Sequence, residues 1–157
     1  MPGGLVRAVL AGNVVLANAI GNGIADDKLT YTYVPPDLVR YYLEEEPILA
    51  SVDTWRLEDR EAREEVLDRL DELVLKPVDG SGGKGGVVIG PAASRSQLDA
   101  LRRRVLEDPR GWIAQPLVQL STIPPTLVEE GLEPPRHVDL RSFALNDGED
   151  VWVLPGG

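Results

Sequence analysis

Lysines and glycines suited to binding phosphate lie together in one stretch, Leu73–Gly90, which reads LVLKPVDGSGGKGGVVIG. Lys76 ends a short β-rich run, and Lys84 lies in the glycine-dense segment Gly80–Gly86, ahead of a second β-rich run, Val87–Ile89. Glycines let a backbone approach a ligand closely, and successive backbone N–H groups can cradle phosphate oxygens. The order strand, loop, strand therefore predicts a glycine-rich flap over a nucleotide.

Two other interpretations of this stretch have to be weighed. A Walker A loop needs Gly, four residues and Gly-Lys-Ser/Thr ahead of a helix. Here Gly83-Lys84 is followed by Gly85, and Val78 stands where the first glycine would be, so the stretch is not a P-loop. Taken alone, it is equally consistent with a β-hairpin that has a flexible glycine turn. The stretch alone does not distinguish a nucleotide flap from a hairpin turn, so the remaining residues are needed.

Composition limits the function further. The chain has 157 residues, 43% hydrophobic and 27% charged, which is enough to bury a core as an ordinary globular domain. Its net charge of −10 argues against a general nucleic-acid or anionic-membrane surface, but not against ATP held by local charge and Mg²⁺. There is no cysteine, which excludes disulfides and thiolate sites, and the single histidine, His137, excludes a multi-histidine metal site.

The N-terminus loosely resembles a signal peptide, because Leu5–Ile20 is mostly apolar. Arg7, Asn13 and Asn18 interrupt this run and Gly12 divides it, so a signal peptide is not expected. No apolar run is long enough for a transmembrane helix. A cytoplasmic protein is expected.

Apolar periodicity and capping residues predict a mixture of helices and strands. We expect an α+β (α/β two-layer) fold, in which an antiparallel sheet carries the lysine and the flap and helices pack on one side. Helices are expected at Pro2–Leu10, from Lys28 after an Asp26 or Asp27 cap, after Pro35-Pro36-Asp37, at Glu58–Leu70 and after Ser94. Strands are expected at Val14–Ala17, Leu73–Lys76, Val87–Ile89, Trp112–Val118, Arg136–Leu145 (half-buried) and Val151–Leu154, with Ile48–Trp55 extended, Ser121–Pro135 as loop and a turn at Asn146-Asp147-Gly148.

Short motifs follow one another along nearly the whole chain. They are Gly12-Asn-Val with Asn18-Ala, Asp26-Asp-Lys28, Tyr41-Tyr-Leu with Glu45-Glu-Pro-Ile-Leu49, Val74-Leu-Lys-Pro77 with Gly80-Ser-Gly-Gly83, Ile113-Ala-Gln-Pro116 with Leu120-Ser121, and Pro135-Arg-His-Val-Asp-Leu-Arg141. In this order they resemble the ATP-grasp superfamily, most closely its circularly permuted type 2 members, which are related to glutathionylspermidine synthase-like proteins. The resemblance implies an ATP-grasp-like fold with an N-terminal lobe (1–57), a nucleotide-binding subdomain with the flap (58–120) and the truncated start of a second subdomain (121–157).

The resemblance also implies roles for individual residues. Lys28 and Lys76 would hold the α- and β-phosphates, although Lys28 alone is also consistent with a solvated surface lysine. Arg141 would contact a phosphate or acyl phosphate as the catalytic residue. His137 would line the nucleotide site or be a structural histidine. The remaining expected ATP contacts are the flap residues Gly80, Ser81, Gly82, Gly83, Lys84 and Gly85, the hinge residues Gln115, Pro116 and Leu117, and Asp139.

The implied activity is that of an ADP-forming carboxylate–amine ligase that uses ATP and Mg²⁺ and works through an acyl phosphate. Its partners would be a small-molecule or peptide carboxylate and an amine, with no nucleic acid or membrane. Two positions depart from the family pattern: Lys84 stands where relatives usually have an aromatic residue, and Ser142 where they have proline. The family's Mg²⁺ ligands would fall beyond Gly157, so the chain resembles a segment.

Three hypotheses remain open at this point. The chain is part of a ligase, or a non-catalytic or degenerate ATP-grasp module that binds nucleotide without turnover, or a structural domain of unrelated function. Because the sheet would be incomplete at its C-terminal edge, self-association or pairing with a missing C-terminal segment is expected. A monodisperse monomer in sedimentation would count against that expectation.

Overall fold

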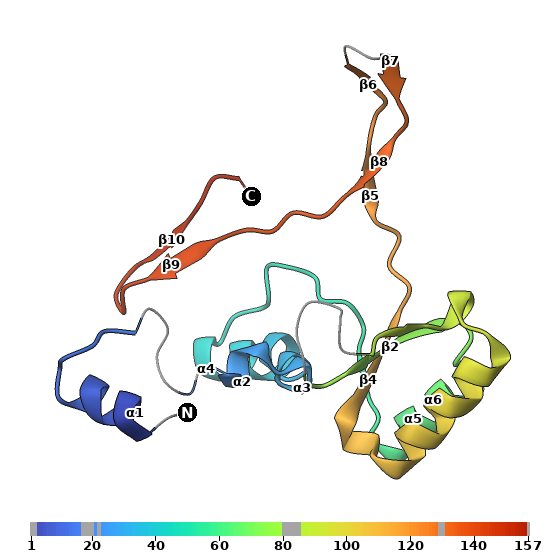
Figure 1. The fold of residues 1–157 in the computed structure, drawn as a ribbon, viewed down its shortest axis with the longest axis horizontal. Helices are drawn as coiled ribbons and strands as arrows, with labels where there is room; N and C mark the ends of the chain where they lie inside the picture. Colours follow the sequence, from blue (N-terminus) through green and yellow to red (C-terminus); the bar gives the residue numbers. More distant parts are fainter. Residues whose placement is uncertain (1–2, 17–20, 22, 80–85, 129–130, 157) are drawn as a thin grey trace. The chain divides into compact units, whose positions relative to one another are not determined.

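The computed structural model describes residues 3–16, 21, 23–79, 86–128 and 131–156 (Figure 1). The chain forms two compact units, residues 1–117 and residues 118–157. The finer division at residues 57 and 120 stays a prediction. The predicted mixture of helices and antiparallel strands is confirmed.

The first unit is built on a four-stranded antiparallel sheet with the strand order β1-β4-β2-β3. The strands are β1 (Trp55–Arg56), β2 (Leu73–Pro77), β3 (Val88–Ile89) and β4 (Trp112–Pro116). The two central strands pair over their whole length, from Leu73 opposite Pro116 to Pro77 opposite Trp112. β2 and β3 are antiparallel neighbours, which confirms the predicted strands on either side of the glycine-rich segment.

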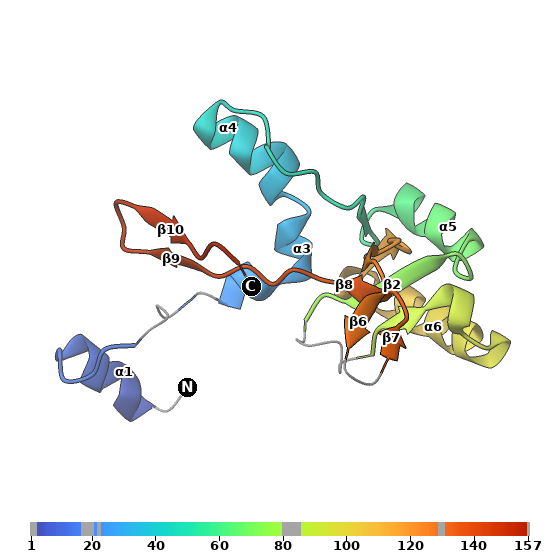
Figure 2. The same cartoon turned by 90° about the horizontal axis from the view of Figure 1, so that it is seen from above.

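Two helices, α5 (Arg60–Asp68) and α6 (Arg95–Glu107), cover one face of this sheet (Figure 2). Side chains alternate between the two faces of a strand, so Leu73 and Leu75 of β2 point to the helices while Val74 and Lys76 point away. The buried cluster between the helices and the sheet comprises Leu57, Val66, Leu67, Leu70, Leu73, Leu75, Leu101, Val105, Trp112 and Ala114. The predicted layer of helices on one side is therefore confirmed.

Side-chain caps fix where both helices begin. Asp59 accepts hydrogen bonds from the backbone N–H groups of Glu61 and Ala62, at 2.9 and 3.3 Å. Ser94 and Gln97 form a capping box, in which each side chain bonds to the other residue's backbone N–H. Substituting such a cap usually costs about 1 kcal/mol, so these residues set the register in which the apolar stripes meet the sheet.

The N-terminal part of the first unit contains short helices. They are α1 (Gly3–Leu10), α2 (Gly23–Asp26), α3 (Lys28–Tyr31) and α4 (Val39–Leu43), with a π-helical turn at Val34–Leu38. The expected helix at residues 2–10, the Asp27 cap and the helix after Pro35-Pro36-Asp37 are confirmed.

The strand expected at Val14–Ala17 is wrong. Residues 14–16 form no strand, and Val14 and Val15 are exposed, Val15 to 92%; Ala17 lies outside the described residues. β-Branched residues favour a strand only where a neighbouring strand offers hydrogen bonds and an apolar face. The sequence pattern contains no information about that neighbour.

The second unit consists of antiparallel strand pairs in its described part. The pairs are β5 (Ser121–Ile123) with β8 (Arg136–Val138), β6 (Thr126–Val128) with β7 (Gly131–Glu133), and β9 (Ala144–Asn146) with β10 (Val151–Val153). Ser121–Pro135 was expected as loop, yet it contains three of these strands, so that expectation is wrong. Prolines end and separate the strands here without preventing their pairing.

The single half-buried strand expected at Arg136–Leu145 is also wrong. Only its ends lie in strands, and its described side chains are exposed. The turn predicted at Asn146-Asp147-Gly148 is confirmed between β9 and β10. The backbone N–H groups of Asp150 and Glu149 donate to the Asp147 carboxylate, and these bonds hold the pKa of Asp147 below its ordinary value.

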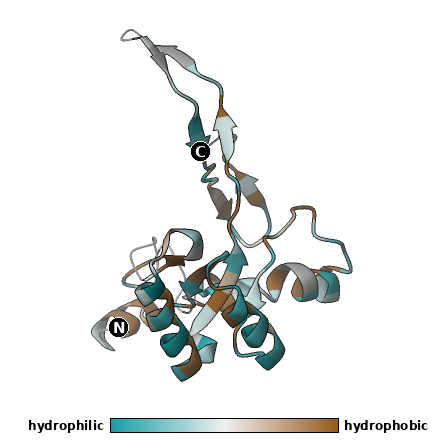
Figure 3. Ribbon diagram, turned by 90° about the vertical axis from the view of Figure 1, so that its right-hand side faces the viewer, coloured by the Kyte–Doolittle hydropathy of each residue, from teal (hydrophilic) through white to brown (hydrophobic). Residues whose placement is uncertain are grey.

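The charged helices and the β9–β10 hairpin differ in the polarity of the side chains they expose. In Figure 3, the charged helices are largely teal, with brown apolar positions interspersed. The β9–β10 hairpin carries apolar side chains that are exposed, among them Leu145, Trp152 and Val153. No helix in the part of the chain that the structure describes is long and apolar enough to cross a membrane.

Candidate functional site

The sheet face opposite α5 and α6 carries the first candidate residues. Lys76 of β2 lies opposite Ile113, and Val74 lies opposite Gln115, so Lys76 and Gln115 are diagonal neighbours on the same face. The Lys76 ammonium donates a hydrogen bond of 2.6 Å to the Oε1 atom of Gln115. Both residues were predicted as ATP contacts from separate motifs, and the structure brings them into direct contact.

Sequence reasoning missed a third member of this group, Thr54. The Gln115 Nε2 group donates to Thr54 Oγ1 at 2.8 Å, and the Thr54 hydroxyl donates to the carbonyl oxygen of Val52 at 2.9 Å. The pairing of Trp55 with Ala114 places Thr54 beside Gln115. An antiparallel register between β1 and β4 would have predicted this neighbour, but nothing in the sequence alone indicates that register.

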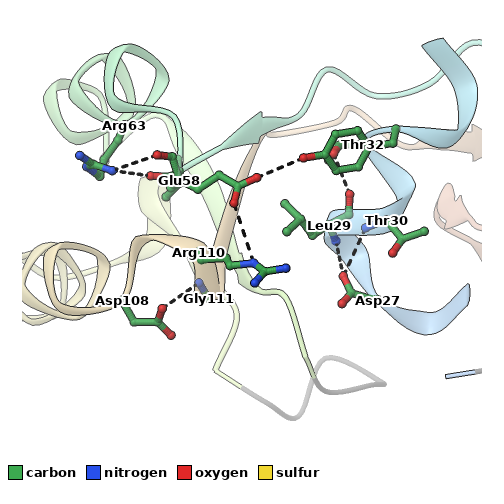
Figure 4. Close-up of polar contacts among 11 residues, drawn as sticks. Asp27, Leu29, Thr30, Thr32, Glu58, Arg63, Asp108, Arg110 and Gly111 are labelled. Carbon is green, nitrogen blue, oxygen red and sulfur yellow. Dashed lines mark hydrogen bonds and ion pairs between the residues drawn. The ribbon is translucent and has the colours of Figure 1, made fainter. Parts of the chain in front are cut away.

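Lys28 lies at the first position of α3, close to the end of β2. The Asp27 carboxylate accepts hydrogen bonds from the backbone N–H groups of Leu29 and Thr30, at 2.7 and 3.2 Å (Figure 4). The Lys28 backbone N–H donates to the carbonyl oxygen of Val78 at 3.3 Å. The cap therefore fixes where α3 starts, and the bond to Val78 places that start next to the strand that carries Lys76.

A cluster of polar contacts around Glu58 ties the segment after α3 to the sheet. The Tyr33 hydroxyl donates to Glu58 at 3.1 Å, and the Arg110 guanidinium lies 3.8 Å from the same carboxylate (Figure 4). The guanidinium of Arg56 lies 4.5 Å from the centroid of the Tyr33 ring. Each contact at an exposed site contributes little by itself. Together they connect Tyr33, two residues after the end of α3, to residues at the edge of the sheet.

A cavity of about 530 Å³ lies where the start of α3, the end of β2 and the turn at Pro109–Gly111 meet. Its lining mixes charges of both signs, including Asp27, Asp79, Arg104 and Arg110. The lining includes Pro77 but neither Lys76 nor Gln115. We therefore place the candidate site on the sheet face opposite α5 and α6, where the half-buried Lys76 and Gln115 lie beside the buried Val74 and Ile113, and not in this cavity.

The remaining predicted nucleotide contacts lie outside the described residues, directly after Gln115 in the chain, or in the second unit. The flap residues Gly80, Ser81, Gly82, Gly83, Lys84 and Gly85 lie outside the described residues. Pro116 ends β4, and Leu117, next in the chain, is 44% exposed. His137 pairs with Thr122 in the second unit, where His137, Asp139 and Arg141 are all exposed. Their predicted contacts with nucleotide stay predictions.

Within the described residues, no group of three or more histidine, aspartate or glutamate side chains could hold a metal ion. Mg²⁺ that accompanies ATP is usually bound by one or two carboxylates together with the phosphates, so a site of that kind does not need such a group.

Comparison with known proteins matches the chain to one family and to several relatives. Residues 2–157 match the family described as circularly permuted ATP-grasp type 2. An uncharacterized protein of Mycobacterium tuberculosis is 60% identical over 98% of this chain, which spans 27% of that protein. An uncharacterized protein of Synechocystis is 47% identical over 98% of this chain, which spans 31% of that protein.

A further relative has a name that states a reaction. The Frankia alni protein named "Putative glutamate--cysteine ligase 2-3" is 54% identical over 95% of this chain, which spans 17% of that protein. The chain thus covers about a quarter of the length of the first of these relatives and less of the last. The match over residues 2–157 shows that the chain belongs to the circularly permuted ATP-grasp type 2 family.

Proposed function

We propose that this chain is the ATP-binding part of an ADP-forming ligase that joins a carboxylate to an amine. The observation that carries the proposal is the direct hydrogen bond between Lys76 and Gln115 on the sheet face opposite α5 and α6. Family membership supports ATP as the nucleotide. The name of the Frankia relative supports a ligase of the carboxylate–amine type.

Lys76 suits the role of a phosphate ligand because it offers a compact charge with three N–H donors. Gln115 accepts one of them, so two remain to meet phosphate oxygens. The chain contains three lysines, Lys28, Lys76 and Lys84. All three lie in or beside the elements proposed to surround the phosphates, in a chain whose net charge is −10.

The proposed reaction has two steps. A carboxylate oxygen of the first substrate attacks the γ-phosphorus of ATP, ADP leaves, and an acyl phosphate forms. The amine nitrogen of the second substrate then attacks the acyl carbon, inorganic phosphate leaves, and the amine loses a proton. Such chemistry depends on positioning and on neutralising charge, which is where Lys28, Lys76 and Arg141 would act.

A second candidate function is nucleotide binding without turnover. Family membership and the contact between Lys76 and Gln115 support nucleotide binding, and they apply equally to this candidate. Both candidates require ATP to bind at Lys76. They differ in whether the intact protein releases ADP when it is given a carboxylate and an amine.

The first experiment is a calorimetric titration of this chain with ATP and Mg²⁺, alongside Lys76→Met. We expect saturable binding by the unchanged chain and an affinity roughly 10- to 100-fold weaker in the variant, since a hydrogen bond to a charged group contributes about 1.5–3 kcal/mol. Arg60→Met is the matched control. It removes the same charge from an exposed ion pair with Glu64 on α5 and should leave the affinity unchanged.

The outcomes separate the interpretations. A folded chain that does not bind ATP would contradict both candidate functions. Equal affinity in the unchanged chain and in Lys76→Met would show that ATP binds elsewhere. An affinity lost equally in Arg60→Met would indicate a general dependence on charge instead of a phosphate contact.

A further inference from the structure

The hydrogen bonds around Gln115 have a direction that follows from the number of protons available. A threonine hydroxyl carries one proton and can donate only once. Thr54 uses that proton on the carbonyl oxygen of Val52, at 2.9 Å. The Thr54 oxygen can therefore only accept a bond from Gln115, so the group that faces it at 2.8 Å is the Gln115 NH₂.

This direction determines what Gln115 presents to Lys76. With its NH₂ group turned to Thr54, the amide has its carbonyl oxygen turned to the Lys76 ammonium, at 2.6 Å. The opposite orientation would place N–H donors against the ammonium and a carbonyl oxygen against an oxygen that has no proton left to give. Thr54 thus selects the amide orientation that can hold a cation.

The same path continues to the helix that carries the other lysine. The backbone N–H of Val52 donates to the Tyr31 hydroxyl at 3.2 Å, and Tyr31 is the last residue of α3. A continuous series of hydrogen bonds therefore runs from α3 through Val52, Thr54 and Gln115 to Lys76. Lys28 begins the same helix. The two elements that carry candidate phosphate ligands are joined by this path.

Thr54 is not part of the apolar core. It is half-buried, lies just before β1, and borders a cavity of about 370 Å³ that Tyr31 and Val52 also line. Its methyl group does not belong to the buried cluster beneath α5 and α6. Removing its hydroxyl should therefore change the polar path while leaving the core packing intact.

We propose that Thr54 is a positioning residue for the ATP site, acting on Lys76 through the orientation of the Gln115 amide. This inference rests on the proposed function, in which the Lys76 ammonium meets a phosphate. Thr54 itself touches no phosphate. Its contribution is to hold the ammonium in place on the sheet face opposite α5 and α6 before ATP arrives, which reduces the ordering that binding requires.

The test compares Thr54→Val, which keeps the shape and loses the hydroxyl, with Thr54→Ser, which keeps the hydroxyl. Two readouts are needed: the NMR signals of the Gln115 side-chain NH₂ without nucleotide, and the calorimetric affinity for ATP with Mg²⁺. We expect Thr54→Val to shift the Gln115 signals and to weaken ATP binding roughly 3- to 10-fold, the range for one neutral hydrogen bond. Thr54→Ser should restore both.

A double variant distinguishes positioning from a merely structural effect. If Thr54 acts through Lys76, then Thr54→Val should cost no further affinity when Lys76 is already methionine, so the two losses are not additive. Additive losses, or unshifted Gln115 signals in Thr54→Val, would overturn the inference. If the unchanged chain does not bind ATP, the proposed function fails, whereas the NMR readout still decides whether Thr54 orients Gln115.

Discussion

Replacing Gly90 with alanine is expected to destabilise the first unit more than any other single methyl addition at a described glycine. A Cβ atom at Gly90 would lie 2.0 Å from the carbonyl oxygen of Leu70 and 2.6 Å from that of Leu73. Both neighbours are backbone atoms in the turn that leads from α5 into β2, and neither can rotate away. The expected loss is at least about 3 kcal/mol of unfolding free energy, above the usual range for overpacking.

Two other glycines provide a graded comparison in thermal unfolding experiments. A Cβ atom at Gly111 would meet only the side chain of Asp108, at 2.2 Å, and that side chain can move. A Cβ atom at Gly4 in α1 meets nothing within 4 Å. We expect melting temperatures to fall strongly for Gly90→Ala, less for Gly111→Ala and not at all for Gly4→Ala. A Gly90→Ala variant as stable as Gly4→Ala would contradict the described packing of the α5–β2 turn.

The first unit was predictable from sequence where local signals and the apolar pattern agree. Asp27 and Ser94 mark helix starts by their side-chain chemistry alone, and the periodicity of α5 and α6 identified the helix faces that became buried. These features depend on residues a few positions apart, so a single sequence contains them.

The predictions that failed depend on partners that are distant in the chain. Val14 and Val15 lack a neighbouring strand in the described structure, and the residues of Arg136–Leu145 pair only at their ends. Thr54 was missed because its role comes from the register between β1 and β4, which joins residues 61 positions apart. Pairing and register are tertiary properties, and short polar or β-branched runs do not encode them.

Leu75 and Lys76 are adjacent in β2 but point to opposite faces, so stability and ATP binding should be separable on this strand. Leu75 is fully buried between the sheet and the helices. Leu75→Ala should therefore cost about 2–5 kcal/mol, the usual range for a leucine cavity, while leaving the Lys76 ammonium in place. Lys76→Met removes the ammonium and should leave the core unchanged.

Melting curves with and without ATP and Mg²⁺ test this separation. A ligand at 100 times its Kd adds about 2.7 kcal/mol to the stability of the protein that binds it. Leu75→Ala should melt well below the unchanged chain and gain a comparable stabilisation at the same ratio of ATP to its own Kd. Lys76→Met should melt close to the unchanged chain and gain much less at the ATP concentration that saturates the unchanged chain. If Lys76→Met lowered the melting temperature as much as Leu75→Ala, Lys76 would be supporting the folded structure itself, and its ammonium would not be held in reserve for a phosphate.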